Sequence, residues 1–186
     1  MAPTDGLVVK TDFTIYEVYH VEFDIKILAT HTEDWKIVFY IGSGTGMSPG
    51  HRHPAVFTYK NSIGLYNRFH LDESTNYILN LPLAALDTWY HMIYRQYISS
   101  TDGLYYLEVT LDGVQMMLEI NDAPIQVSDA SIWVAPYSSS PVLIQNFKYT
   151  TADRKSFIYY DKNLCSLKLK LLKLKNIARV KTHYFK

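Results

Sequence analysis

Apolar and polar residues alternate along two neighbouring segments in the middle of the chain, residues 105–111 and 114–120. In the first segment the apolar side chains fall on every second residue: Tyr105, Leu107, Val109 and Leu111. The spacing resumes in the second segment at Val114, Met116, Leu118 and Ile120. A period of two is typical of a strand with one buried face. Asp112-Gly113 between the segments provides the positive backbone angles of a tight turn, so the pattern predicts a β-hairpin.

Similar apolar runs predict strands over most of the first 150 residues. The clearest covers residues 19–27, where apolar residues alternate with His20, Glu22, Asp24 and Lys26. Further strands are predicted at residues 35–41, 55–59, 64–71, 76–81, 131–135 and 142–150, with another starting at Trp89. About ten to twelve short strands and no convincing helix favour an all-β fold, an antiparallel β-sandwich, over a barrel or an α/β fold.

The charges divide the chain into an acidic part and a basic part, although the net charge of all 186 residues is zero. Residues 1–152 carry a net charge of −8 and residues 153–186 a net charge of +8. We therefore expect a polar N-terminal lead-in (1–14), a sandwich domain (15–152) and a basic C-terminal tail (153–186).

The tail alternates leucine and lysine over residues 167–175, and its lysines do not line one face of a helix. Its charge predicts association with an anionic surface, or folding back onto the acidic domain; an appendage outside the fold is the plainer interpretation. Aromatic residues occur only near its ends, so specific nucleic-acid binding is not predicted.

Location is only weakly constrained by the sequence. Cys165 is the single cysteine, which excludes an intramolecular disulfide and a cysteine-based metal site. No apolar run reaches the ~20 residues that a transmembrane helix needs, so a transmembrane protein is not expected. The first residues lack the pattern of a signal peptide.

The order of a Trp89-led strand, a loop, a strand ending in Asp112-Gly113 and a returning strand resembles the laminin-G/concanavalin-A-like β-sandwiches. A second set of residues is similar to the metazoan, cnidarian-type farnesoic-acid O-methyltransferase-like domains. It comprises Gly50-x-Arg52-x-Pro54-Ala55-Val56, Trp89, Gln96, Asn121-x-x-Pro124, Trp133/Pro136/Tyr137 and Asn146-Phe147. The resemblance implies a jelly roll, an extracellular location and a binding or adhesion role. The chain lacks the glycine-rich turn between a strand and a helix that a nucleotide-type cofactor would require.

Four residues are the candidates for ligand binding. Arg52 and His53 follow a glycine-rich segment, and Trp133 and Tyr137 lie beside a proline-bounded loop, where exposed aromatic side chains favour recognition. The alternative for Arg52 and His53 is an exposed polar loop in which Arg52 bonds a carboxylate. Trp35 and Trp89, on apolar runs, are predicted to pack in the core.

No catalytic or metal-binding set is predicted. Glu22 and Asp24 share one strand face, but no third acid follows them, and the polar face of an ordinary strand explains both. Asp102, Asp112 and Asn121 could offer oxygen ligands to calcium, but tight turns require the same residue types. We predict no cofactor and no metal, and leave calcium open.

These observations together predict a recognition module rather than an enzyme. It would bind a carbohydrate or an extracellular protein through loops or a sheet face. The alternatives are a glycan-active or methyl-transferring enzyme, and a protein that associates with a surface through its cationic tail.

Overall fold

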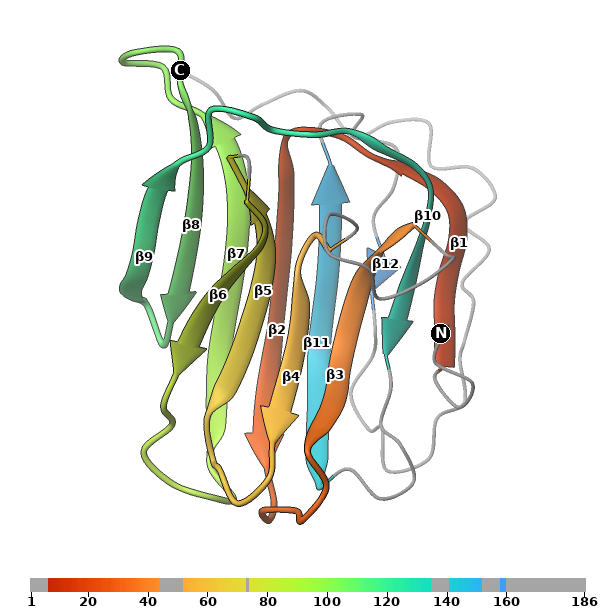
Figure 1. The fold of residues 1–186 in the computed structure, drawn as a ribbon, viewed down its shortest axis with the longest axis vertical. Coiled ribbons are helices and arrows are strands. Elements are labelled where there is room, and N and C mark those ends of the chain that lie inside the picture. The colour runs from red at the N-terminus through yellow and green to blue at the C-terminus, as the bar shows by residue number, and fades with distance from the viewer. Residues whose placement is uncertain (1–6, 44–51, 73, 135–140, 152–157, 160–186) are drawn as a thin grey trace.

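The computed structural model describes residues 7–43, 52–72, 74–134, 141–151 and 158–159, and these residues form two antiparallel sheets of six strands each (Figure 1). Sheet A has the order β1 (Leu7–Ile15), β10 (Val127–Val134), β3 (Trp35–Ser43), β4 (Ala55–Tyr59), β5 (Leu65–Leu71) and β6 (Ser74–Leu81). Sheet B has the order β12 (Ile158–Tyr159), β11 (Val142–Thr151), β2 (Tyr19–Ile27), β7 (Trp89–Ile98), β8 (Tyr105–Leu111) and β9 (Val114–Ile120). No helix occurs among these residues, and none of them could therefore form a membrane-spanning helix.

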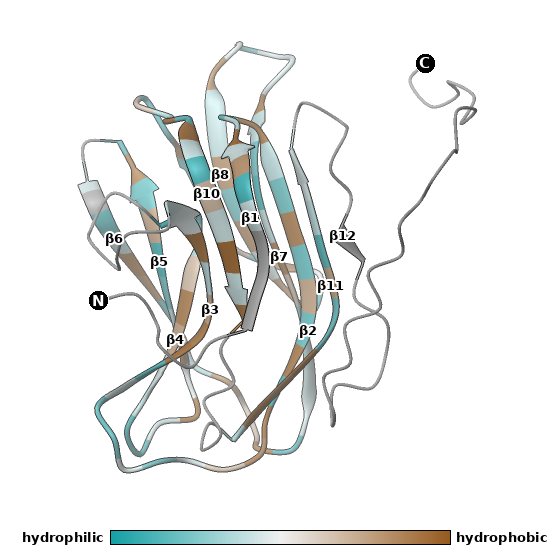
Figure 2. Ribbon diagram, turned by 90° about the vertical axis from the view of Figure 1, so that its right-hand side faces the viewer, coloured by the Kyte–Doolittle hydropathy of each residue, from teal (hydrophilic) through white to brown (hydrophobic). Residues whose placement is uncertain are grey.

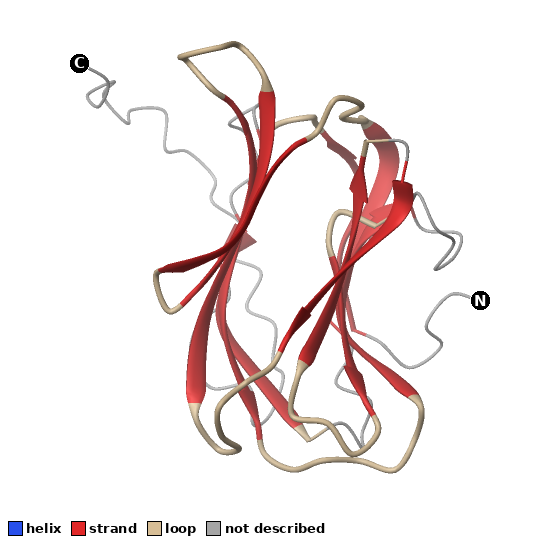
Figure 3. Ribbon diagram, turned by 60° about the vertical axis from the view of Figure 1, so that its left-hand side comes forward, coloured by secondary structure: helices blue, strands red, loops and turns tan. Residues whose placement is uncertain are grey.

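The two sheets lie face to face and enclose the hydrophobic core (Figure 3). Figure 2 shows hydrophobic and hydrophilic bands alternating along the strands. Strand β2 illustrates the reason, since its residues alternate strictly between buried and half-buried positions. Phe23 on β2 packs edge-on against Phe39 of sheet A at 4.8 Å between ring centroids and stacks on Tyr94 at 5.8 Å. Each such buried ring stabilises the fold by about 2–3 kcal/mol.

A buried polar contact also connects the sheets through the core. Asn67 on β5 is fully buried, and its amide donates hydrogen bonds to the carbonyl oxygens of Leu65 (3.2 Å) and Leu79 (3.1 Å). The hydroxyl of Tyr94 on β7 donates to the amide oxygen of Asn67. Because both polar groups are satisfied only in this arrangement, the contact fixes how the sheets sit on each other.

The structure confirms the predicted all-β sandwich and most of its strands. Residues 19–27 and 55–59 form strands with the predicted bounds. The lead-in differs from the expectation, because residues 7–14 belong to β1 and pair with β10. Repeated register shifts in that pairing interrupt the alternation that would have marked a strand. In the tail, residues 158–159 pair with β11, and the rest of residues 153–186 lies outside the described residues.

The predicted hairpin is present, but the buried face assigned to its second strand is wrong. Asp112 (φ 50°) and Gly113 (φ 79°) both adopt left-handed angles, as the turn requires. On β9, however, Met117 is buried, and the residues predicted to face the core are all at least 38% exposed: Val114, Met116, Leu118 and Ile120. The register explains the change, since Thr110 pairs with Gln115 whereas Val109 pairs with Met117. One extra residue on β9 forms a bulge that inverts the later side chains.

Candidate functional site

The outer face of sheet A carries an unusual density of aromatic and cationic side chains. The cross-strand pairs Trp35–Tyr59, Phe57–Tyr66 and Arg68–Ile78 place these residues on the face opposite the core. We call this surface the sheet A face and define it by Trp35, Tyr40, Arg52, Phe57, Tyr59, Tyr66, Arg68, Asn76, Ile78, Asn80 and Trp133. Its strands β3, β4, β5 and β6 are consecutive neighbours in the sheet (Figure 1).

Trp35 is the centre of an aromatic cluster on this face. Its ring centroid lies 4.5 Å from that of Tyr59, 5.2 Å from that of Tyr66 and 6.3 Å from that of Phe57. The indole is still 46% exposed. The prediction that Trp35 and Trp89 pack in the core is therefore wrong, since Trp89 is also 39% exposed.

Two guanidinium groups lie beside the aromatic cluster. Arg68 stacks over Trp35 (5.1 Å to the ring centroid) and Phe57 (5.4 Å), and Arg52 lies 5.5 Å from the centroid of Phe57. Both donate a hydrogen bond through Nη1 to the side-chain oxygen of Asn76, at 3.0 Å from Arg68 and 2.5 Å from Arg52. A neutral amide oxygen therefore holds two positive groups close together.

The titration of Arg52 and Tyr40 reflects this arrangement. Burial and the positive charge of Arg68 lower the pKa of Arg52, with the nearby phenol of Tyr40 acting in the opposite direction. Burial raises the pKa of Tyr40 to about 12, against the opposing effect of Arg52. The two guanidinium groups thus repel each other in a partly desolvated setting.

The four predicted site residues separate in the structure. Arg52 is 7% exposed and belongs to the sheet A face. Trp133 is half-buried on β10 and packs against the buried cluster of the same face that contains Tyr40. His53 is 3% exposed, with its ring 6.3 Å from Tyr19 and 6.2 Å from His70. Arg52 and His53 therefore do not form the exposed polar loop of the alternative interpretation, and Tyr137 lies outside the described residues.

The sequence missed Trp35, Arg68 and Asn76 as site residues. These residues lie on β3, β5 and β6, and their contacts depend on how the strands pair. Arg68 stands in a strand of ordinary composition, Leu-Tyr-Asn-Arg-Phe-His-Leu. The only local signal was the i, i+2 spacing of Tyr66 and Arg68, which places both on one strand face.

The outer face of sheet B has a different character, because acids and bases alternate there. Lys148 Nζ lies 2.8 Å from Glu22 Oε1, and His91 Nδ1 lies 2.7 Å from Asp24 Oδ1. Asn146 donates a second hydrogen bond to Asp24. Because a carboxylate only accepts, the proton of the His91–Asp24 bond is on His91 Nδ1.

The electrostatics of these two acids follow from their partners. Burial raises the pKa of Asp24, but hydrogen bonds from His91 and Asn146 outweigh it, so the pKa lies below its usual value. Burial likewise raises the pKa of Glu22, and the hydrogen bond and charge of Lys148 outweigh it. Both acids are therefore held in their charged forms by neighbours on the same face.

The turn residues considered for calcium binding use their side-chain oxygens in hydrogen bonds within the protein. Asp112 accepts a hydrogen bond from the backbone of His91 at 2.7 Å, and Asp102 accepts one from the backbone of Leu104 at 3.0 Å. Asn121 accepts from the backbone of Asp72 at 2.8 Å and donates to Gln96 at 2.6 Å. Among the described residues, no group of three or more His, Cys, Asp or Glu side chains is arranged to hold a metal ion.

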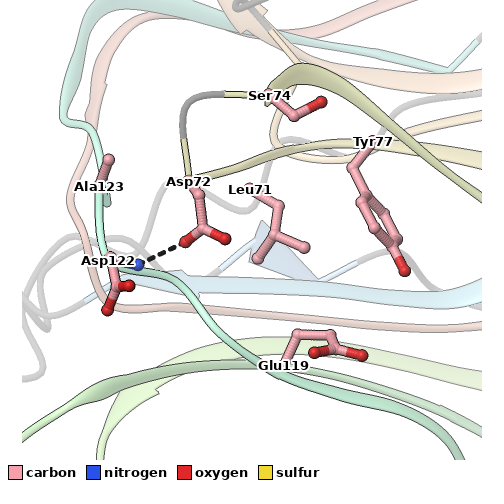
Figure 4. A pocket seen from close by; sticks show the side chains of 7 residues that line it. All are labelled: Leu71, Asp72, Ser74, Tyr77, Glu119, Asp122 and Ala123. Atoms are coloured by element: carbon pink, nitrogen blue, oxygen red, sulfur yellow. Dashed lines mark hydrogen bonds between the residues drawn. The ribbon is translucent and has the colours of Figure 1, made fainter.

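A pocket of about 710 Å³ opens at the β6 and β9 edges of the sandwich (Figure 4). It is lined by Leu71, Asp72, Ser74, Tyr77, Glu119, Asp122 and Ala123. The carboxylate of Asp72 accepts a hydrogen bond from the backbone of Asp122 at 2.6 Å, drawn as a dashed line in Figure 4. That bond links the β5–β6 turn to the segment after β9, so Asp72 has a structural role there.

Comparison with known proteins gives similar folds but no family. No protein-family model and no curated protein matches the chain. An alginate lyase of Zobellia galactanivorans is 14% identical, with 76% of this chain and 65% of the lyase covered and a TM-score of 0.48. Sheep galectin-11 is 9% identical (80% and 100% covered, TM-score 0.45). The CBM40 of a Ruminococcus gnavus sialidase, bound to sialyllactose, is 10% identical (71% and 78% covered, TM-score 0.45). This chain thus spans slightly less than two thirds of that lyase.

The two antiparallel six-stranded sheets, with no helix among the described residues, confirm the predicted jelly-roll β-sandwich. Membership of the farnesoic-acid O-methyltransferase-like group stays a prediction. The prediction that the chain is not an enzyme is contradicted, because the similar structures include several alginate lyases alongside the lectin-like domains. The fold therefore does not exclude catalysis.

Proposed function

We propose that the chain binds carbohydrate on the sheet A face. The observation that carries the proposal is Trp35, a half-exposed indole at the centre of a cluster of Tyr59, Tyr66 and Phe57. Exposing so much aromatic surface costs free energy in the absence of a ligand. A sugar ring offers an apolar face of C–H groups that would cover the indole and recover part of that cost.

Polar groups next to the indole supply the directional contacts that a sugar needs. Asn80 is exposed on β6, at the position that pairs with Tyr66. Tyr59 and Tyr66 are half-buried, so each presents an apolar ring and a hydroxyl in the same region. An apolar platform with a few polar groups at its margin is typical of small-molecule recognition.

The test is a glycan-array screen of the full chain, followed by titration of the best ligand with two matched variants. Trp35→Ala removes the platform, and we expect it to weaken binding by about tenfold or more, because aromatic anchors dominate such contacts. Trp89→Ala is the control, since Trp89 is similarly exposed but lies on sheet B, where Lys26 stacks at 5.3 Å. An equal loss in both variants, or no loss with Trp35→Ala, contradicts the proposal.

A glycan-cleaving activity is the second candidate, and the observation that favours it is the Asp24–His91 pair. A histidine whose Nδ1 is held by a carboxylate is a suitable general base through its other nitrogen, and His91 Nε2 lies 3.8 Å from Glu22. The assay is the appearance of new chain ends in polysaccharides incubated with the full chain. Activity that persists in His91→Gln contradicts this role for the pair. Surface association through the basic tail stays a prediction.

A further inference from the structure

We propose that the sugar bound by the sheet A face carries a carboxylate, and that the guanidinium of Arg68 receives it. The inference rests on the proposed function and adds the chemical class of the ligand, an acidic sugar such as a uronate or a sialate. Four properties of the described residues lead to it.

The first property is the unmet hydrogen-bonding capacity of Arg68. Of its five N–H donors, the structure gives one to the side chain of Asn76, and its shielded Nε–H has no hydrogen-bond partner. A buried polar group that is left without a partner lowers the stability of the fold. No ion pair connects Arg68 to a carboxylate in the part of the chain that the structure describes.

The second property is the contrast with other cations. Five other lysine and arginine side chains each make an ion pair with a carboxylate: Lys26, Lys36, Lys60, Arg95 and Lys148. The acids that lie closest along the chain to Trp35 are already used, since Glu33 pairs with Lys36 at 2.9 Å and Asp34 pairs with Lys60 at 2.6 Å. Arg68 is thus left with an uncompensated charge on a face where the neighbouring acids are engaged.

The third property is the proximity of Arg52. Both guanidinium groups donate to the same uncharged oxygen of Asn76, so a second positive group lies beside Arg68. An anion placed beside Arg68 gains from its charge in a partly desolvated setting, where the attraction is stronger than in water.

The fourth property is geometric. The flat guanidinium of Arg68 is held against Trp35 at 5.1 Å and Phe57 at 5.4 Å, so its orientation is fixed before a ligand arrives. A sugar packed on the exposed part of the indole would bring its carboxylate to the neighbouring guanidinium, whose planar edge suits a planar carboxylate.

The experiment titrates the full chain with two pairs of probes that differ in charge but little in shape. The first pair is trigalacturonate and its fully methyl-esterified form, and the second is sialyllactose and its methyl ester. We expect at least one charged probe to bind about tenfold more tightly than its neutral partner, and the pair that does so distinguishes a uronate from a sialate. Arg68→Ala should remove that preference, and Arg68→Lys should restore only part of it because lysine lacks the planar fork.

Arg95→Ala is the matched control, because Arg95 also stacks on a ring (Tyr97, 4.9 Å) but is paired with Glu108 on sheet B. We expect it to keep the preference. Equal binding of charged and neutral probes, lost in Trp35→Ala, overturns the acidic-sugar inference and leaves the proposed function standing. A charge preference that survives both Trp35→Ala and Arg68→Ala overturns the inference by placing the binding elsewhere, for example on the basic tail. Binding of none of the four probes overturns the inference, while the glycan array still tests the proposed function.

Discussion

The outer faces of the two sheets are built from the same kind of strand but handle charge in opposite ways. On sheet B, Glu22 pairs with Lys148, Asp24 with His91, and Arg95 with Glu108. On the sheet A face, Arg68 and Arg52 share one neutral oxygen of Asn76 and lie against aromatic rings.

Under the proposed function, the difference separates charges that serve the fold from a charge that would serve a ligand. A cation with a neighbouring carboxylate is already neutralised, so a ligand anion would have to compete with that partner. Arg68 has no such competitor among the described residues. Exposed aromatic surface points the same way, because Trp35 is the centre of a cluster of rings on sheet A, whereas Trp89 on sheet B is covered partly by Lys26.

The largest change in stability that we predict concerns β9, at the edge of sheet B. It tests which side chains of this strand face the core and which face solvent. Met117→Asp places a charge in the core, where Met117 is 6% exposed, and should lower the free energy of unfolding by about 3–5 kcal/mol. Leu118→Asp changes an exposed side chain and should have an effect within about 0.5 kcal/mol. Urea unfolding of both variants measures these free energies. A larger loss in Leu118→Asp than in Met117→Asp would mean that Leu118 faces the core, as the alternation alone predicts.

The next effect concerns the core that both faces share. Asn67→Ala leaves the hydroxyl of Tyr94 buried without its partner and should cost about 2–3 kcal/mol in unfolding free energy. Because Asn67 faces the core, the same variant should keep the glycan preference of the folded protein. Thermal unfolding and titration on one sample measure both quantities. A selective loss of binding at full stability would mean that the sheet A face depends on Asn67 directly.

A smaller effect tests whether the charges of sheet B serve stability. The folded-state pKa values of Glu22 and Asp24 are lowered, so the stability that they provide is present above their unfolded pKa values, about 4, and is lost as pH falls through the lowered values. The double variant Glu22→Gln, Asp24→Asn should be about 1–2 kcal/mol less stable at neutral pH and lose less on acidification. If the unfolding free energies of the native protein and the double variant depend on pH in the same way, this role is contradicted. Glycan binding by the double variant at neutral pH should not change.

Much of the fold could be predicted because its strands obey the period of two. Residues 19–27 alternate cleanly, and the turn at Asp112-Gly113 has residue types that left-handed angles require. The errors occur where that period fails locally. Register shifts in its pairing with β10 obscure β1. On β9, the bulge lies between Gln115, which pairs with Thr110, and Met117, which pairs with Val109, and it reverses which side chains of β9 face solvent. A bulge depends on pairing between strands, which a single sequence does not display.

The candidate site was predicted only in part, since Arg52 and Trp133 lie on the face but Trp35, Arg68 and Asn76 were missed. Trp35 opens an apolar run, and apolar composition alone does not separate a ring that faces the core from a ring that faces solvent. The importance of Arg68 comes from neighbours on three other strands: Trp35, Phe57 and Asn76. Such a constellation becomes visible only once the strand order is known.

The most direct test of the central claim is to locate a bound acidic sugar on the molecule. The side-chain Nε–H resonances of Arg68 and Arg95, and the indole N–H resonances of Trp35 and Trp89, form two matched pairs for NMR titration with the charged probe that binds. We expect the resonances of Arg68 and Trp35 on the sheet A face to shift with saturation, while those of Arg95 and Trp89 on sheet B stay in place. Shifts confined to Arg95 and Trp89, or saturable binding that moves none of the four, would contradict the account.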